Sequence, residues 1–234
     1  MKHDRSFSPA RPARQYTTPR GEQTRQSILR SAADIASAEG LDGLSIGRLA
    51  SELSMSKSGL FSHFGCKEEL QLAVVEAARE TFMQEVVNPA AESQPGIPRL
   101  CAMLEAWIAC IQRRTFRGGC FFAAVAAEFD SRSGPVREKI VSLMRAWYVA
   151  IRGEVQRAQS LGQISLELDP AQIAFELVAL VHEANSVFQL LGQEDAFERA
   201  RRGVIERLRS AATDPAGQFL PGLTGSGVSL ARAS

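Results

Sequence analysis

The residues of this 234-residue chain best suited to hold a charged partner gather in one short stretch, Ser45 to Leu70. Lys57 carries an ammonium group that can contact a phosphate or donate to a guanine edge. Ser58 and Gly59 follow it and are small enough to let a helix approach its partner closely. His63 comes shortly after and could reach another phosphate. This chemistry recognises a polyanion through hydrogen bonds and charge.

Two short helices and a tight turn are expected to position these side chains. Ser45 is a suitable N-cap for the first helix, whose apolar residues recur at helical spacing. Residues 54–56 interrupt that pattern, and a second helix follows from Ser56 with Leu60 and Phe64 as its inward anchors. A short helix, a turn and a second helix with small and basic residues is the layout of a helix-turn-helix DNA reader.

Charge is uneven along the chain. The formal net charge is only +1, but residues 1–30 hold seven basic and two acidic residues. Three prolines and scattered serines in residues 1–20 favour a disordered arm. Two interpretations of this arm stay open: a solvated tail, or a contact with DNA phosphates or a minor groove.

Composition also bounds the location and the chemistry. The N-terminus lacks the apolar core of a signal peptide, and no apolar run is long enough to cross a bilayer. We therefore expect a cytoplasmic protein without membrane contact. The four cysteines form no CxxC pair, which favours free thiols in a reducing compartment. Cys66 is expected to fill a helix junction rather than sense redox state. No His/Cys spacing predicts a metal site, and no motif predicts a cofactor.

The periodicity predicts an all-α fold of about nine helices and no strand. A first helix is expected over Glu22–Ala38, ended by Gly40, and a long fourth helix over Lys67–Val87. Prolines and glycine from Asn88 to Pro98 predict a break in the chain. The remaining helices are expected over 98–114, 120–129, 135–161, 170–191 and 194–212.

The segment Ser56-Lys57-Ser58-Gly59-Leu60-Phe61-Ser62-His63-Phe64, followed by Lys67-Glu68-Glu69-Leu70, resembles the TetR family of helix-turn-helix transcriptional regulators. The likeness is most specific over residues 24–70. Beyond that stretch, the chain resembles the family only in helix order and length. The family's string has Tyr where this chain has Phe61, so the hydroxyl bond to phosphate is lost and that contact is in doubt.

This resemblance implies a set of DNA contacts on the matching positions. They are Ser45, Ser56, Lys57, Ser58, Gly59, Phe61, His63 and Lys67. Two of them have an alternative interpretation that involves no DNA: His63 as a surface histidine and Lys57 as a solvated charge. Leu60 and Phe64 are expected in the core.

The resemblance also implies a domain plan. A disordered basic arm spans 1–20, and a DNA-binding helix-turn-helix domain spans 21–67, with its motif at about 45–64. A helical regulatory and dimerisation domain spans 68–212, and a flexible tail spans 213–234. The helix at 170–191 is apolar nearly all round, which independently predicts burial on several sides. A homodimer through about 170–212 is therefore expected, with a purely internal core helix as the alternative.

Members of the family usually act as ligand-gated switches. The resemblance therefore implies a ligand site in the helical regulatory domain, which we call the body. The side chains suited to a lipophilic or aromatic effector, each of which could equally be core, are Phe82, Trp107, Cys110, Phe116, Phe121, Phe122, Met144, Trp147, Tyr148, His182, Asn185 and Phe188. His182 and Asn185 are the least explained by packing.

The resulting prediction is a ligand-responsive repressor that binds a palindromic double-stranded operator as a dimer through helix 56–64. A small helical enzyme is the alternative from another class, but only three histidines exist and Glu128 and Asp130 lack an evident partner. A helical interaction module without DNA affinity is the second alternative. We expect no enzyme.

Overall fold

The computed structural model describes residues 19–213, 216 and 219–220. Within these residues the chain is all-α, as predicted. The elements are α1 (Pro19–Gly43), α2 (Ile46–Glu52), α3 (Lys57–His63), α4 (Lys67–Phe82), the π-helical turn η1 (Met83–Val87), α5 (Asn88–Ala91), α6 (Ile97–Gln112), α7 (Phe121–Phe129), α8 (Pro135–Ser160), α9 (Pro170–Leu191) and α10 (Ala196–Ala211). With the unbroken run 67–91 taken as one rod, the described part holds nine helices. The predicted arm and tail fall almost wholly outside the described residues.

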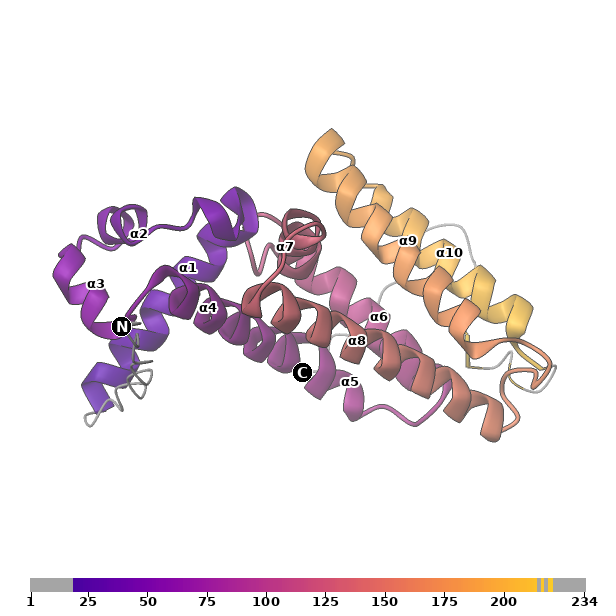
Figure 1. Ribbon diagram of the computed structural model, residues 1–234. Coiled ribbons are helices and arrows are strands. Elements are labelled where there is room, and N and C mark those ends of the chain that lie inside the picture. Colours follow the sequence, from indigo (N-terminus) through magenta and orange to yellow (C-terminus); the bar gives the residue numbers. More distant parts are fainter. Residues whose placement is uncertain (1–18, 214–215, 217–218, 221–234) are drawn as a thin grey trace, which may run out of the picture.

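The molecule is elongated, with the α2–α3 pair at one end and α9 and α10 at the other (Figure 1). Its apolar side chains form two clusters. The head core is built by α1, α2, α3 and α4, and also by α7 and the first half of α8. The body core is built by η1, α5, α6, the second half of α8, α9 and α10. The α7 helix therefore packs on the head, across the predicted boundary at residue 67, and that boundary stays a prediction.

The first helix is longer than predicted and bent. Gly40 has φ 80° and ψ 159°, so the regular helix ends there, as the sequence indicated, but a further helical turn continues to Gly43. Leu41 and Leu44, each with 0% of the side chain exposed, draw this extra turn onto the head core. The burial of these two leucines outweighs the break at Gly40.

The break predicted to start at Asn88 is wrong. Regular helix ends at Phe82, and the chain then continues through the π-turn and α5 to Ala91. Pro89 lacks an N–H and its ring would crowd the carbonyl four residues earlier in a regular helix. The wider π-turn places this proline at the start of a new helical segment instead. The real interruption covers only residues 92–96.

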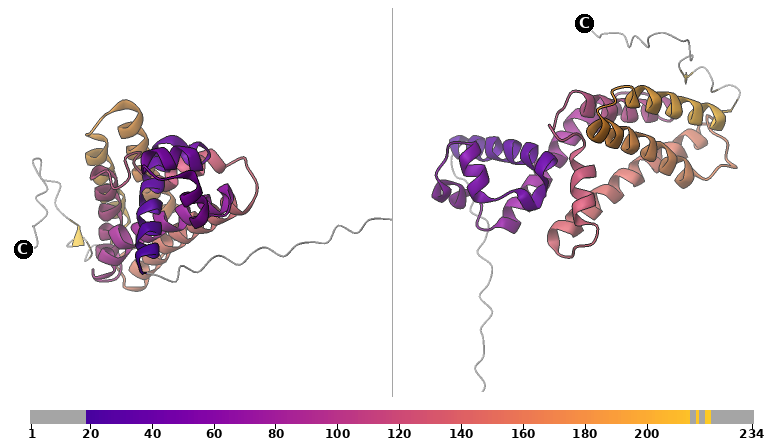
Figure 2. Two further views of the ribbon diagram at one scale, coloured as in Figure 1. Left: turned by 90° about the vertical axis from the view of Figure 1, so that its left-hand side faces the viewer. Right: turned by 90° about the horizontal axis from the view of Figure 1, so that it is seen from above.

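The last two helices lie side by side and pack on α8 and α6 (Figure 2). Asp169 caps α9 by accepting a hydrogen bond from the Ala171 amide at 2.9 Å, and Gly192 ends the helix with a left-handed φ of 67°. Gly203 of α10 lies so close to α9 that a Cβ there would stand 3.0 Å from Leu180. None of the described helices has the length and apolar character needed to span a membrane.

Candidate DNA-reading surface, head–body junction and ring cluster

The α2–α3 pair has the geometry expected of a helix-turn-helix. Ser45 caps α2 by accepting from the Arg48 amide at 3.1 Å, and Ser56 caps α3 by accepting from the Gly59 amide at 3.1 Å. Ser54 takes a left-handed φ of 52° in the turn between them. The capping role predicted for Ser45 is thus confirmed. Both hydroxyl groups satisfy amides that would otherwise lack partners, which fixes where each helix begins.

The start of α3 presents small and basic side chains to solvent. Lys57 and Ser58 are exposed, while Leu60 and Phe64 are buried in the head core, as predicted. Among the described residues, no carboxylate forms an ion pair with Lys57. The ammonium group is therefore available to a partner outside the chain. The predicted contact by the Phe61 ring lies outside the described side chains.

Two other predicted contact residues are engaged within the chain. Lys67 Nζ donates to the carbonyl oxygen of Asp42 at 2.9 Å and pairs with its carboxylate at 3.0 Å. This pair lowers the pKa of the Asp42 carboxyl, with a hydrogen bond from Arg132 as the next cause. His63 is half-buried, and burial together with the nearby Arg25 charge lowers its pKa, which favours the neutral imidazole near pH 7.

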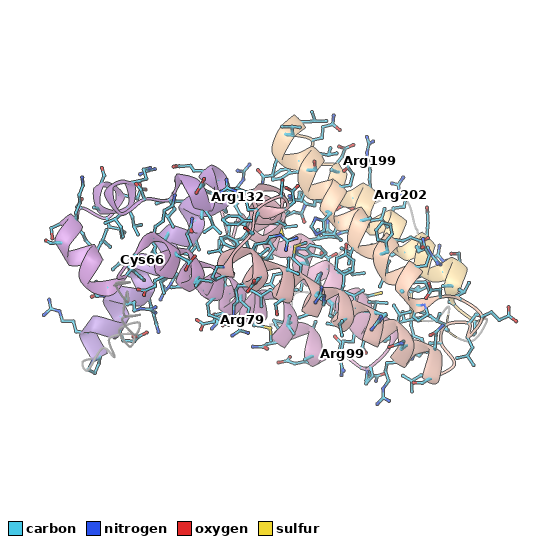
Figure 3. The ribbon with its side chains drawn as sticks, in the orientation of Figure 1. Cys66, Arg79, Arg99, Arg132, Arg199 and Arg202 are labelled. Carbon is cyan, nitrogen blue, oxygen red and sulfur yellow. The ribbon has the colours of Figure 1, made fainter. Side chains whose placement is uncertain are left out.

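Glu128 lies on α7, which follows the predicted boundary at residue 67, and it contacts α1, which precedes that boundary. We call the contact between α7 and α1 the head–body junction. Its carboxylate oxygens accept hydrogen bonds from the Leu41 and Asp42 amides, each at 2.7 Å, just after the bend in α1. Arg132, labelled in Figure 3, lies in the loop just after α7 and pairs with Asp42 at 2.9 Å. Sequence reasoning found no partner for Glu128 and considered it only as an acid of an enzyme. The structure gives it two backbone donors, so its polarity serves the junction.

Further polar contacts complete this junction. The buried Gln71 side chain donates to the Leu41 carbonyl at 2.9 Å. The loop before α7 donates to α1 through the Arg117 amide to Asp34 at 2.7 Å and the Gly118 amide to the Ser37 hydroxyl at 3.0 Å. The approach is so close that a Cβ on Gly118 would lie 2.0 Å from the Ser37 carbonyl oxygen. The role of Gln71 and Gly118 in this junction could not be predicted from the sequence, because each depends on a contact distant along the chain.

Ring-bearing side chains from five helices meet in the body, and we call Phe82, Trp107, Phe122, Trp147 and His182 the ring cluster. Trp147 lies edge-on to Phe82 and Trp107, with ring centroids 4.9 and 5.5 Å apart. Phe82 also contacts Phe122 at 6.0 Å, and Trp107 contacts His182 at 5.2 Å. The structure thus brings five of the predicted lining residues together.

The other predicted lining residues lie in different surroundings. Phe116 and Phe121 are buried in the head core, where Met144 also packs. Phe188 contacts Phe197 of α10 with the two rings tilted and their centroids 4.9 Å apart, and it lies under the Arg114 guanidinium. Asn185 accepts a hydrogen bond from the Cys120 amide at 2.9 Å, a structural bond that accounts for its polarity. Tyr148 and Cys110 pack in the body core.

The ring cluster contains buried donors without acceptors. Within the described residues, neither the Trp107 nor the Trp147 indole nitrogen has a hydrogen-bond partner, and both atoms are closed to solvent. The Cys120 sulfur is a weak acceptor near the Trp107 nitrogen, and this interaction acts to lower the pKa of that thiol, so Trp147 is the clearer of the two unpaired donors. Burial lowers the pKa of His182, so its ring is favoured in the neutral form. These five rings therefore offer donors and no formal charge at neutral pH.

The cysteines and acidic groups form no metal site in the described part of the chain. Cys66 is exposed and caps α4, its sulfur accepting from the Glu69 amide at 3.5 Å. Burial raises the pKa of the Cys101 thiol to about 11 and also raises the pKa values of Cys110 and Cys120. These three side chains are therefore held as thiols.

Two family models match this chain. One describes bacterial regulatory proteins of the tetR family and matches residues 28–74; the other describes the C-terminal domain of tetracyclin repressor-like proteins and matches residues 96–204. Together they span about two thirds of the sequence. Among curated proteins, none matches significantly.

Solved structures of similar fold include two that are described as TetR regulators. A TetR transcriptional regulator from Chloroflexus aurantiacus matches with a TM-score of 0.77 and 24% identity, over 83% of this chain and 98% of its own. A TetR-family regulator from Streptomyces coelicolor matches with a TM-score of 0.69 and 23% identity, over 82% and 96%. AibR, in complex with isovaleryl coenzyme A and operator DNA, matches with a TM-score of 0.63 and 22% identity, over 76% and 94%. At these identities the likeness concerns the fold alone.

Proposed function

This chain belongs to the TetR family of transcriptional regulators, which are DNA-binding transcription factors and not enzymes, and we propose that it is an effector-released repressor. Its operator is a palindromic duplex, read by α3 of each subunit in a homodimer. The observation that carries this proposal is the exposed start of α3, where the Ser56 cap fixes the helix and Lys57 forms no ion pair with any described residue. A regulator of this kind acts on the chromosome, so we place it in the cytoplasm.

In this proposal α3 enters the major groove. Lys57 contacts phosphate or a guanine edge, Ser58 and Gly59 permit close approach, and the Ser45 and Ser56 hydroxyls lie at helix starts that favour a phosphate. Lys67 contributes less, because binding a phosphate requires it to leave Asp42. His63 is expected to contribute as a neutral donor.

Exposed apolar side chains near both ends of α9 support the proposed dimer. Most apolar side chains of α9 are buried within the subunit, but Phe175, Leu190 and Leu191 keep 59%, 81% and 61% of their surface exposed. The neighbouring α10 presents charged side chains such as Arg199 and Arg202 (Figure 3). A second copy that covers these apolar side chains would place two α3 helices about 34–36 Å apart, or a multiple of that, on a two-fold operator.

Sedimentation tests the dimer. Phe175→Glu and Leu190→Glu should each shift the protein toward monomer and weaken operator binding. Leu166→Glu, at an equally exposed leucine outside α9, serves as the control. A dimer that survives both α9 substitutions would move the interface elsewhere.

A gel shift with the DNA upstream of the protein's own reading frame tests the operator proposal. Phosphate contacts predict binding that weakens steeply as salt rises. A helical module without DNA affinity would give no shifted band at any salt concentration, and that result would reject the proposal.

Release is proposed as a population shift. A lipophilic or aromatic effector in the body favours a spacing of the two heads that does not fit the operator, and α4 carries the change, since it begins beside α3 and ends at Phe82. A full switch from 1:99 to 99:1 needs a preference of about 5.5 kcal/mol for the non-binding state. A molecule that saturates the body while leaving operator affinity unchanged is not the effector.

A further inference from the structure

The two buried indole N–H groups of the ring cluster call for a physical explanation. A buried donor without an acceptor carries a free-energy cost, and native proteins rarely leave one unpaired. Here two such donors lie on neighbouring rings 5.5 Å apart, on α6 and α8. Apolar side chains would pack as well in their place without that cost. A role in binding would account for both donors.

The surroundings of these donors restrict what could satisfy them. Their ring neighbours are Phe82, Phe122 and His182, none of which carries a carboxylate to attract a cationic amine. The flat faces and edges of five rings favour an aromatic or lipophilic body. The indole nitrogens favour a hydrogen-bond acceptor on that body.

The ring cluster also adjoins a π-helical turn. Phe82 is the last residue of α4, and the π-turn η1 begins at the next residue. Such turns are frequent at functional sites. A molecule entering between the tryptophans must displace the Phe82 ring, which lies 4.9 Å from Trp147. That displacement acts at the end of the helix that leads to the DNA-reading head.

From these observations we propose that the effector is an aromatic molecule with an uncharged acceptor, such as an aryl ketone, whose oxygen accepts from the Trp147 indole N–H. Trp107 donates second, to the same oxygen or to another acceptor. The claim that this ligand is the effector rests on the proposed function, whereas the chemical class of the ligand is inferred from the ring cluster alone.

Nuclear magnetic resonance provides a direct test, because the chain contains only two tryptophans. In the full-length ¹⁵N-labelled protein, the two indole signals are assigned with Trp147→Phe and Trp107→Phe. The probes are acetophenone and ethylbenzene, which have nearly the same shape but differ in the carbonyl. Acetophenone should move the Trp147 indole proton downfield, as a new hydrogen bond does, and ethylbenzene should not.

Affinities measured in the same titrations extend the test. Trp147→Phe keeps a ring but removes the donor, so it should weaken acetophenone about tenfold and ethylbenzene less than twofold. Phe82→Leu is the matched control within the cluster, since it removes a ring without a donor and should leave the ratio of the two affinities unchanged. If Trp147→Phe fails to fold, Trp107→Phe provides the same comparison.

Several results would overturn the inference: equal affinities for the two probes, no downfield shift with acetophenone, or no binding of acetophenone up to its solubility limit. A gel shift on the same sample separates this failure from failure of the proposed function. Operator binding that is released by a hydrocarbon or an amine, but not by acetophenone, would leave the regulator intact and reject the ligand class. A downfield shift in a protein that binds no operator DNA would support the ligand class and reject the proposed function.

Discussion

At the head–body junction, Gln71, Ser37 and Glu128 each hydrogen-bond to a backbone group, whereas in the ring cluster two indole N–H groups find no acceptor among the described residues. Satisfied polar contacts hold one geometry, because breaking any of them leaves a buried group unpaired. An unsatisfied donor stabilises no particular arrangement within the chain, and it favours the binding of a molecule that supplies an acceptor. In the proposed switch, the junction transmits to the DNA-reading head a geometry that is set by the state of the ring cluster.

The largest effect is expected at Gly118. In Gly118→Ala the new Cβ would meet the Ser37 carbonyl oxygen at 2.0 Å, so α7 must move away from α1. We expect a loss of about 3 kcal/mol in unfolding free energy, measured by thermal or urea unfolding. Gly153→Ala is the control, because a Cβ on this helical glycine meets no atom within 4 Å and should stabilise α8 slightly. Equal stability of the two variants would contradict the close packing of the junction.

A smaller loss is expected from Glu128→Ala, which removes the acceptor for two backbone amides. Hydrogen bonds to a charged group contribute about 1.5–3 kcal/mol each in favourable cases, and the amides can partly rehydrate, so we expect about 2 kcal/mol in urea unfolding. Asp130→Asn, at an exposed carboxylate two residues away, should change little. An unfolding free energy unchanged by Glu128→Ala would mean that the two hydrogen bonds do not stabilise the packing of α7 on α1.

Trp147→Phe should cost less than about 1 kcal/mol, although it alters a partly buried aromatic side chain. The lost ring contacts are offset because an unpaired donor disappears from the interior. Unfolding measured without any added ligand tests this point. A loss as large as that of Glu128→Ala would show that the indole N–H is satisfied in the folded protein, and the contrast between the two regions would fail.

The smallest effect concerns pH. Burial lowers the pKa of His182 below its usual 6.5, so the unfolded chain binds the proton more tightly. Stability is therefore unaffected well above pH 6.5 and decreases as the pH falls from about 6.5 toward the lower pKa of the folded state. In His182→Gln the decrease should be weaker, with the remainder partly due to His63, whose pKa is also lowered. Parallel stability curves for the two proteins would exclude this role.

Local signals in the sequence predicted most of the helices. Ser45, Ser56 and Asp169 lie at helix starts because their side chains cap the first turn, and that chemistry depends only on neighbours in the chain. Apolar spacing likewise identified Leu60 and Phe64 as core. The all-α class followed from these patterns together.

Long-range contacts could not be predicted in the same way. Helical spacing shows which face is apolar but not which helix covers it, so Phe121 and Phe122 were assigned to one pocket although Phe121 packs in the head core. Glu128 acquires its partners 86 and 87 residues away. The π-turn at Met83–Val87 was missed because it depends on how Pro89 is accommodated in a packed helix.

The central claim is that α3 reads DNA through the exposed Lys57. Its most direct test is the dissociation constant of the operator complex at several salt concentrations, for the unmodified protein, Lys57→Ala and Arg152→Ala, an exposed arginine of the body. We predict that Lys57→Ala weakens binding at low salt and reduces the salt slope by about one unit per copy of Lys57, while Arg152→Ala leaves both unchanged. Unchanged affinity and slope in Lys57→Ala would contradict the account.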